Sequence, residues 1–364
     1  MIEIRHLKLI HTVAKVGTLK KAAEKLFLTQ SALSHQLKEL ESRLDTKIFH
    51  RINNQLMFTD AGRELLNASE DILVRLEKAQ DNIREINQDR MKNYIHGYSH
   101  EETTRLNDQA GTIAELLHWD SFWEKGSLIL EAGCGVGAQT KIISKNNPDS
   151  SFISVDISSI SLEQAKKIIH ETDVKNVEFV LADILDLPFD DGYFDHIFVC
   201  FVLEHLSEPA KALKELKRVL KPKGSLMVIE GDHGSTYFYP DSVSAQNAVQ
   251  AQVLLQQQKG GNANIGRELY PLLYAHGFEN IVVSPRQVYV DDSKPDLVEG
   301  FIKNTFTAMI KGVSEEALIN KIISKVDMDR GIDDLFKTAK GGGTFCYTFF
   351  KAIAVKADIL NKDD

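Results

Sequence analysis

The chain has 364 residues, of which 43% are hydrophobic and 26% are charged, a composition typical of a soluble globular protein. Every apolar run is too short to cross a membrane, and residues 1–10 hold three charges and no apolar signal core, so we expect a cytoplasmic protein. The three cysteines are widely spaced and form no C-x-x-C pair, which predicts neither a disulfide framework nor a zinc site.

The net charge of −9 is unevenly distributed along the chain. Residues 1–59 contain ten Lys and Arg against five Asp and Glu, whereas the rest of the chain carries a net charge of −14. We call residues 1–59 the head and the rest of the chain the body. A basic head and an acidic body indicate a nucleic-acid-binding module fused to a domain of another kind.

Residues 1–59 contain three helical patterns followed by a strand pattern. Apolar residues recur every three positions over residues 4–13 and predict a first helix. Gly17 ends this helix, and Thr18 is placed to cap a short second helix. A third helix begins at Ser31, and residues 47–59 predict a two-stranded wing.

The third predicted helix has an apolar face and a polar face. The apolar positions, which we expect to be buried, are Leu33, Leu37, Leu40 and Leu44. Small polar groups at the start of such a helix can approach base edges, and a cation farther along can reach a phosphate. The candidate DNA-binding residues are Gln30, Ser31, Ser34, His35 and Lys38, with Arg51 at the base of the wing as a further phosphate contact.

About the first ninety residues resemble the DNA-binding region of LysR-type transcriptional regulators, through the pattern LKxAAExLxLTQSALSHQLKELExRL…KIFxR…FTDAG. The resemblance implies a winged helix-turn-helix whose third helix meets DNA through the residues named above. A winged-helix module kept only for dimerisation is the alternative. The family normally continues into a two-lobed effector-binding domain, and this chain does not, so the usual ligand-sensing mechanism does not carry over.

Residues 60–92 predict a long linker helix capped by Asp60. Its apolar and small residues follow a heptad spacing over about three repeats: Leu65, Ser69, Ile72, Leu76, Ala79, Ile83 and Ile86. Such a seam needs a partner, and a two-stranded coiled coil would join two chains into a homodimer. LysR-type regulators use this helix as their dimer interface, and the alternative is a single amphipathic helix packed on its own body.

Residues 93–364 are organised around Leu128–Ala138, which reads LILEAGCGVGA. An apolar run, three alternating glycines and a helix-forming segment predict the strand–turn–helix corner of a Rossmann-like sheet. The glycines are Gly133, Gly135 and Gly137. Their spacing differs from the dinucleotide pattern G-x-G-x-x-G, and Glu131 would repel a pyrophosphate. A carboxylate at this position suits a cationic ligand that carries an amine and a sulfonium.

This stretch resembles E-x-G-x-G-x-G, the first motif of class I S-adenosylmethionine (SAM)-dependent methyltransferases. Asp156 follows the next predicted strand about twenty residues later, where a carboxylate should accept both ribose hydroxyls. In the family, the residue matching Asp183 bonds the adenine amino group, and the residue matching Ile184 packs nearby. The element L-K-P-K-G-x-L, before a later strand, is another hallmark, and the resemblance covers about Leu128–Glu230.

The resemblance implies SAM as the cofactor. A polar segment before the sheet folds over the methionine end of SAM in many class I methyltransferases, which makes Tyr98 and Gln109 candidates for that contact. The complete set of candidate cofactor-binding residues is Tyr98, Gln109, Glu131, Gly133, Gly135, Gly137, Asp156, Ile157, Asp183, Ile184 and Cys200.

The chain after Glu230 departs from the standard pattern. Two helical insertions, residues 242–259 and about 294–340, flank a β-rich stretch, Phe278–Val290, that we expect to be broken at Pro285. Inserts between the final strands would form a lid that excludes water from the reacting sulfonium. We therefore predict a Rossmann-like class I methyltransferase sheet with helical lid insertions, preceded by an all-α winged helix-turn-helix and a long linker helix.

Methyl transfer mainly requires alignment and desolvation of the acceptor, although a hydroxyl or carbon acid also wants a base. His205 and His233 are the candidate bases, and the sequence selects neither of them. A Glu-His pair such as Glu204-His205 is more often a hydrogen-bonded structural pair than a catalytic one. The [DNS]-P-P-[YF] and Pro-Cys motifs of DNA methylation are missing, which favours a small-molecule methyl acceptor. The competing hypotheses are a regulator whose body senses SAM or a metabolite without turnover, and an enzyme that uses its head only to dimerise.

Overall fold

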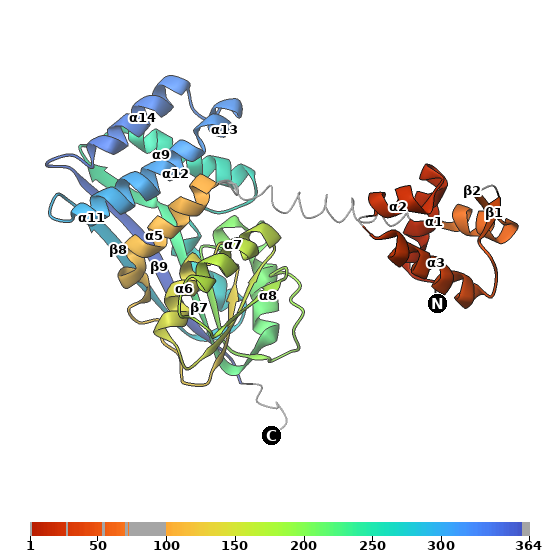
Figure 1. Cartoon of the computed structure of the whole chain (residues 1–364). Coiled ribbons are helices and arrows are strands. Elements are labelled where there is room, and N and C mark those ends of the chain that lie inside the picture. The colour runs from red at the N-terminus through yellow and green to blue at the C-terminus, as the bar shows by residue number, and fades with distance from the viewer. Residues whose placement is uncertain (1, 27, 53–54, 70–71, 73–99, 359–364) are drawn as a thin grey trace. The chain divides into compact units, whose positions relative to one another are not determined.

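The computed structural model describes residues 2–26, 28–52, 55–69, 72 and 100–358. The chain divides into two compact units, Met1–Asp89 and Arg90–Asp364 (Figure 1). Within the described ranges, no helix combines the length and apolar character needed to cross a membrane. The predicted heptad positions beyond Ile72 lie outside the described residues, so the homodimer interface and the exact limits of the linker stay predictions.

The first unit contains the three helices and the wing that the sequence predicts. Its elements are α1 (Ile4–Val16), α2 (Leu19–Lys25), α3 (Gln30–Leu44), β1 (Phe49–Ile52) and β2 (Gln55–Phe58). The Thr18 hydroxyl accepts a hydrogen bond from the Lys21 N–H at 3.3 Å and caps α2, as expected. The next helix begins at residue 60, but its cap is Thr59, whose hydroxyl accepts from the Gly62 N–H at 2.9 Å, so the predicted Asp60 cap is wrong.

The second unit is built on a seven-stranded sheet with the strand order β5-β4-β3-β6-β7-β9-β8. Its strands are β3 (Leu128–Ala132), β4 (Ser151–Asp156), β5 (Val177–Leu181), β6 (Phe194–Cys200), β7 (Leu220–Tyr239), β8 (Phe278–Val290) and β9 (Thr344–Lys356). The first five strands in this order run parallel, and β9 runs antiparallel to both of its neighbours. This order reverses beside β3, and ligands bind at such a switch point in open α/β sheets.

Helices cover both faces of this sheet. The helices outside the insertions are α5 (His100–His118), α6 (Ala138–Asn146), α7 (Ser159–His170), η1 (Leu203–His205), α8 (Pro209–Val219), η2 (Ile265–Glu268) and α10 (Leu269–Ala275). Successive strand residues point to opposite faces, so Ile129 and Phe198 enter the core under α5 and the insertions. Leu130 and Ile197 enter the core under α8 and α10.

The two insertions are helical, as predicted, and gather at one end of the second unit (Figure 1). They comprise α9 (Val243–Gln258), α11 (Pro295–Leu297), the π-helix η3 (Val298–Thr307), α12 (Ala308–Gly312), α13 (Ser314–Ile319) and α14 (Lys325–Lys337). The predicted break at Pro285 is wrong, because β8 runs without interruption from Phe278 to Val290. This strand lies at the edge of the sheet, where a residue without an N–H is tolerated.

A buried ion cluster fixes the carboxyl end of α5 to the sheet. The Lys351 ammonium on β9 donates to the Leu117 carbonyl at 3.2 Å, the Asp120 carboxylate at 2.6 Å and the Ser121 hydroxyl at 2.8 Å. Asp120 also pairs with Arg286 on β8. A cation suits the end of a helix, where the carbonyl groups carry a negative partial charge. Burial lowers the pKa of Lys351, and the Asp120 carboxylate works against that shift.

Removing this cation should weaken the second unit. We expect Lys351→Ala to lower the free energy of unfolding by about 1–3 kcal/mol, because the buried Leu117 carbonyl loses its donor, while Asp120 is partly exposed and keeps Arg286. The exposed Lys340→Ala is the matched control and should change the value by less than about 0.5 kcal/mol. Urea unfolding of the full chain measures both, and equal midpoints would show that the cluster contributes nothing.

Candidate functional site

A cavity of about 280 Å³ opens at the carboxyl ends of the parallel strands. Its lining comes from the segments that follow β3, β4, β5 and β6, together with Leu106 of α5. The predicted cofactor residues that line it are Glu131, Gly133, Gly135, Asp156, Ile157, Asp183, Ile184 and Cys200. Gly137 is not among the lining residues, Tyr98 lies outside the described residues, and Gln109 is placed on α5 without a described side chain.

Two of the three glycines in the turn after β3 are required by packing. Gly133 has a φ of 78°, and a Cβ there would lie 2.4 Å from a methyl carbon of Val202. Gly137 has a φ of 81°, and its Cβ would lie 2.9 Å from that of Ala165 on α7, so its role is close helix packing rather than ligand contact. A Cβ on Gly135 would meet no atom within 4 Å, so this glycine leaves open space on the cavity wall.

Glu131 is a buried carboxylate at the end of β3. Its Oε2 accepts hydrogen bonds from the Thr140 hydroxyl at 2.7 Å and the Ser154 hydroxyl at 2.6 Å. Burial raises the pKa of Glu131 to about 7, and the charge of Asp156 adds to this effect while the two hydroxyls work against it. A cation in the cavity would restore ionisation of this group, because opposite charge lowers the pKa of an acid.

The other two strand-end acids bind neighbouring backbone N–H groups. Asp156 accepts from Gly135 through Oδ2 and from Ser158 through Oδ1, both at 2.8 Å, which joins the glycine turn to the start of α7. Burial raises the pKa of Asp156 against the lowering effect of these bonds. Asp183 accepts from the Leu185 N–H at 3.0 Å. These bonds hold the three acids around one cavity.

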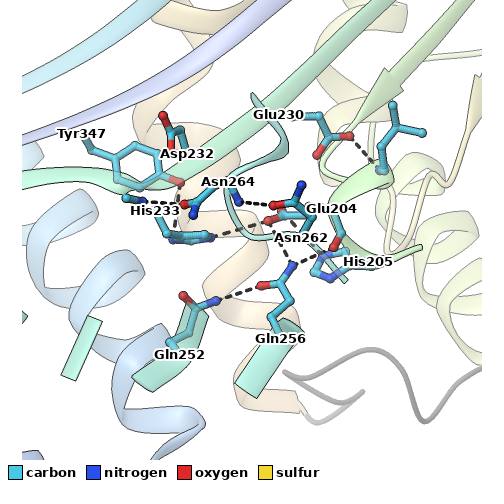
Figure 2. Close-up of polar contacts among 12 residues, drawn as sticks. Glu204, His205, Glu230, Asp232, His233, Gln252, Gln256, Asn262, Asn264 and Tyr347 are labelled. Atoms are coloured by element: carbon cyan, nitrogen blue, oxygen red, sulfur yellow. Dashed lines mark hydrogen bonds and ion pairs between the residues drawn. The ribbon is translucent and has the colours of Figure 1, made fainter. Parts of the chain in front are cut away.

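The two predicted histidines meet at one carboxylate, Glu204 (Figure 2). Glu204 Oε1 lies 3.6 Å from Nε2 of His205, and Oε2 lies 3.5 Å from Nε2 of His233. His205 lines the cavity, whereas His233 lies on β7 outside the cavity lining, with Nδ1 3.5 Å from the Tyr347 hydroxyl. Burial raises the pKa of Glu204, but the two histidines and Gln256 outweigh burial and hold it below its usual range.

Glu230 supports the segment that carries Glu204 and His205. Its Oε1 accepts from the backbone N–H groups of Val202 at 3.0 Å and Leu203 at 2.8 Å. Its Oε2 is buried and has no hydrogen-bond partner among the described residues. Burial, together with the charge of Glu204, raises the pKa of Glu230 well above its usual value, so this acid keeps its proton while Glu204 is ionised.

The sequence interpretation considered Glu204 only as a structural partner of His205 and assigned no role to Glu230. The sequence did carry a signal for Glu230. It follows an apolar run within β7, as Asp156 follows the apolar residues of β4. The signal for Glu204 was its position beside His205, which did not reveal that His233 lies on its other side.

The first unit presents a second candidate site on α3. Gln30, Ser31, His35 and Lys38 are exposed and Ser34 is half-buried, whereas Leu33, Leu37 and Leu40 on the other face are buried. Leu44 is half-buried at the helix end. Arg51 is placed on β1, and its side chain lies outside the described atoms. The predicted DNA-contacting residues of α3 therefore share one open face.

The second unit is thus a Rossmann-like domain with acids at the strand ends, and the first is a winged helix-turn-helix. Residues 130–228 match the family model for a methyltransferase domain, and residues 4–63 match that for bacterial regulatory helix-turn-helix proteins of the lysR family. The chain therefore joins a lysR-family helix-turn-helix domain to a class I methyltransferase domain, which confirms both resemblances.

Curated relatives match one part of the chain or the other. A protein of Streptomyces fradiae, "Uncharacterized 37.1 kDa protein in transposon TN4556", is 35% identical over 190 residues, 51% of this chain and 54% of the relative. The "HTH-type transcriptional regulator MetR" of Buchnera aphidicola is 43% identical over 88 residues, 24% of this chain and 28% of the relative. The "Demethylmenaquinone methyltransferase" of Lactococcus lactis is 36% identical over 115 residues, 31% of this chain and 46% of the relative. The chain thus spans about half or less of the length of these relatives.

The raised pKa of Glu131 has a measurable consequence. The folded chain keeps this proton up to about pH 7 and the unfolded chain only to its ordinary value of 4.5, so the free energy of unfolding falls as the pH rises between them. Glu131→Gln keeps an acceptor for Thr140 and Ser154 but removes the titration. We expect the difference between wild type and variant to change by up to about 3 kcal/mol across this window.

Urea unfolding of the ligand-free chain between pH 5 and pH 8 checks this expectation. The exposed Glu171→Gln serves as the control and should track the wild type at every pH. Parallel curves for the wild type and Glu131→Gln would contradict the assignment.

Proposed function

We propose that the chain is a cytoplasmic SAM-dependent methyltransferase that acts on a small-molecule metabolite and binds DNA through its head. The observation that carries the proposal is the set of acids at the ends of β3, β4 and β5, which surround one cavity beside an open glycine turn. In this proposal, Asp156 binds the ribose, Asp183 and Ile184 contact the adenine, and Glu131 faces the cationic methionine end of SAM.

The residues of the cavity fit this ligand chemically. SAM would supply a methyl group on a positively charged sulfur, already activated for transfer. The buried Glu131 gains its charge when a cation lies nearby, and Gly135 leaves room for close approach of the ligand. The insertions supply the helices α9 and η3, whose packing on the sheet buries the polar groups behind His205.

A small-molecule acceptor is favoured over DNA. The relative from Lactococcus lactis is named for demethylmenaquinone, a small molecule, and the sequence has no DNA-methylation motif. A regulator whose body senses SAM without turnover is the second candidate. It is favoured by the open polar face of α3, which keeps the side chains that a DNA-reading helix needs.

Calorimetry with SAM tests the cofactor site. We expect Asp156→Ala to weaken binding by about 10- to 100-fold, because the variant loses charge-assisted hydrogen bonds to the ribose and the anchor of the glycine turn. The exposed Asp149→Ala is the matched control and should bind as the wild type does.

Release of S-adenosylhomocysteine on a metabolite extract then separates the two candidate functions. Release that depends on the extract supports the enzyme, and SAM binding without release from any fraction favours the sensor. Absence of SAM binding would contradict the proposal that the chain is a SAM-dependent methyltransferase.

DNA binding by the head should be electrostatic and dependent on Lys38. We expect Lys38→Ala to weaken binding and to reduce the slope of log K against log salt by about one. Fluorescence anisotropy with duplex DNA at several salt concentrations measures this, with Lys166→Ala on the surface of the body as the control. Equal slopes for Lys38→Ala and wild type would place the DNA-binding face elsewhere, and no binding at all would favour a head used only for dimerisation.

A further inference from the structure

We propose that Gln139 binds the carboxylate at the methionine end of SAM through its side-chain NH2 group, and that His118 is the positioning residue that orients Gln139 for this contact. The inference rests on the proposed methyltransferase function and concerns the same cavity. It assigns roles to two residues that the sequence patterns did not indicate.

The proposed cofactor brings an anionic group into a cavity lined by acids. The methionine end of SAM carries a carboxylate as well as an ammonium group, and Glu131 suits only the ammonium. Among the described residues that line the cavity there is no lysine or arginine, so this wall offers no permanent positive charge. The partner of the carboxylate must therefore be an uncharged donor, such as a backbone N–H, an amide or a hydroxyl.

Two side-chain amides line the cavity, Gln139 and Gln164. Gln164 lies on α7, after Asp156 and on the side proposed for the ribose. Gln139 is the second residue of α6, and the next residue, Thr140, donates its hydroxyl to Glu131. The N-terminus of α6 also carries a positive partial charge, which favours an anion there. Gln139 is therefore the amide beside the proposed place of the methionine end.

His118 holds the Gln139 amide in one orientation. Its Nε2 lies 2.7 Å from Gln139 Oε1, so the imidazole N–H donates to the amide oxygen. Among the described residues, none accepts a hydrogen bond from the NH2 group of this amide, which leaves that group for a ligand in the cavity. An amide without the histidine could turn its oxygen toward the carboxylate and repel it.

The position of the proton on His118 is set by the buried cluster around Lys351. Lys351 donates to the Ser121 hydroxyl at 2.8 Å, and Ser121 Oγ lies 3.3 Å from Nδ1 of His118. The ammonium group can only donate, so the hydroxyl keeps its own proton for Nδ1, since its other contact, the Met227 sulfur at 3.6 Å, is a weaker acceptor. Burial lowers the pKa of His118 to about 4, so the ring is neutral near pH 7 and its single proton lies on Nε2, toward Gln139.

Decarboxylated SAM separates this contact from the rest of the cofactor site. It keeps the adenosine, the sulfonium and the ammonium group and lacks only the carboxylate. Calorimetry of the full chain at pH 7 with SAM and with decarboxylated SAM therefore reports the carboxylate contact as the ratio of the two dissociation constants. The ratio for the wild type is the reference.

Variants of Gln139 should change the binding of SAM alone. Gln139→Leu should weaken SAM binding by about 10-fold and decarboxylated SAM binding by less than about twofold, because only the carboxylate loses a donor. Gln139→Glu keeps an acceptor for His118 but brings a negative charge to the carboxylate. It should weaken SAM binding by about 100-fold and leave decarboxylated SAM bound as tightly as before or more tightly. The exposed Gln258→Glu on α9 makes the same charge change as a matched control and should alter neither.

Variants of His118 test its positioning role. His118→Leu should weaken SAM binding by about 3- to 10-fold and spare decarboxylated SAM, and His118→Gln, which restores an N–H near the place of Nε2, should recover part of the loss. In a Gln139→Leu background, His118→Leu should cause no further loss, because it acts through the amide. The exposed His170→Gln is the control.

The outcomes separate this inference from the function on which it rests. Binding of both ligands to the wild type, with equal effects of the Gln139 variants on the two, would overturn the inference alone. Equal weakening of both ligands in His118→Leu would give His118 a purely structural role and overturn its part in the inference. Failure of both ligands to bind the wild type would overturn the methyltransferase proposal itself.

Discussion

The second unit depends on the crowding of acidic side chains at the ends of its parallel strands. Neighbouring acids in a small buried volume cannot all be ionised, because their negative charges repel. The four acids therefore differ in protonation and in hydrogen-bond partners. Glu230 keeps its proton, Glu204 is ionised between two histidines, and Asp156 accepts two backbone N–H groups. Glu131 accepts from two hydroxyl donors and lines the cavity. The site is therefore prepared for a positive ligand before one arrives.

The same crowding divides the site into two sides. On one side, the acids of β3 and β4 and the glycine turn suit a cationic cofactor. On the other side, the segment after β6 presents His205, backed by Glu204 and by polar groups of α9 and β7. The first insertion therefore contributes polar groups to this side of the site, because Gln252 and Gln256 belong to α9.

Much of this arrangement could be predicted from the sequence, because strands, helices and turns follow local patterns. The glycine spacing, Glu131, Asp156 and Asp183 are local signals, and they converge because parallel strands end at one edge. The pairing of His233 with Glu204 could not be predicted, since β7 continues past Glu230, where the resemblance ends, and carries this histidine behind the carboxylate. The predicted break at Pro285 was wrong for a related reason. A strand tolerates a proline at the edge of a sheet, and no local sequence pattern reveals that β8 is the edge strand.

The contact between Gly133 and Val202 joins the two sides of the site. The missing Cβ of Gly133 lets Val202 approach, and Val202 lies three residues before His205. This packing therefore sets the distance between the glycine turn and the segment that carries His205. During divergence of related chains, neither position can change freely: a side chain at 133 displaces 202, and a larger residue at 202 presses on the turn. We therefore expect substitutions at positions 133 and 202 to occur together or not at all. Changes in the methyl acceptor should instead arise from substitutions in the insertions.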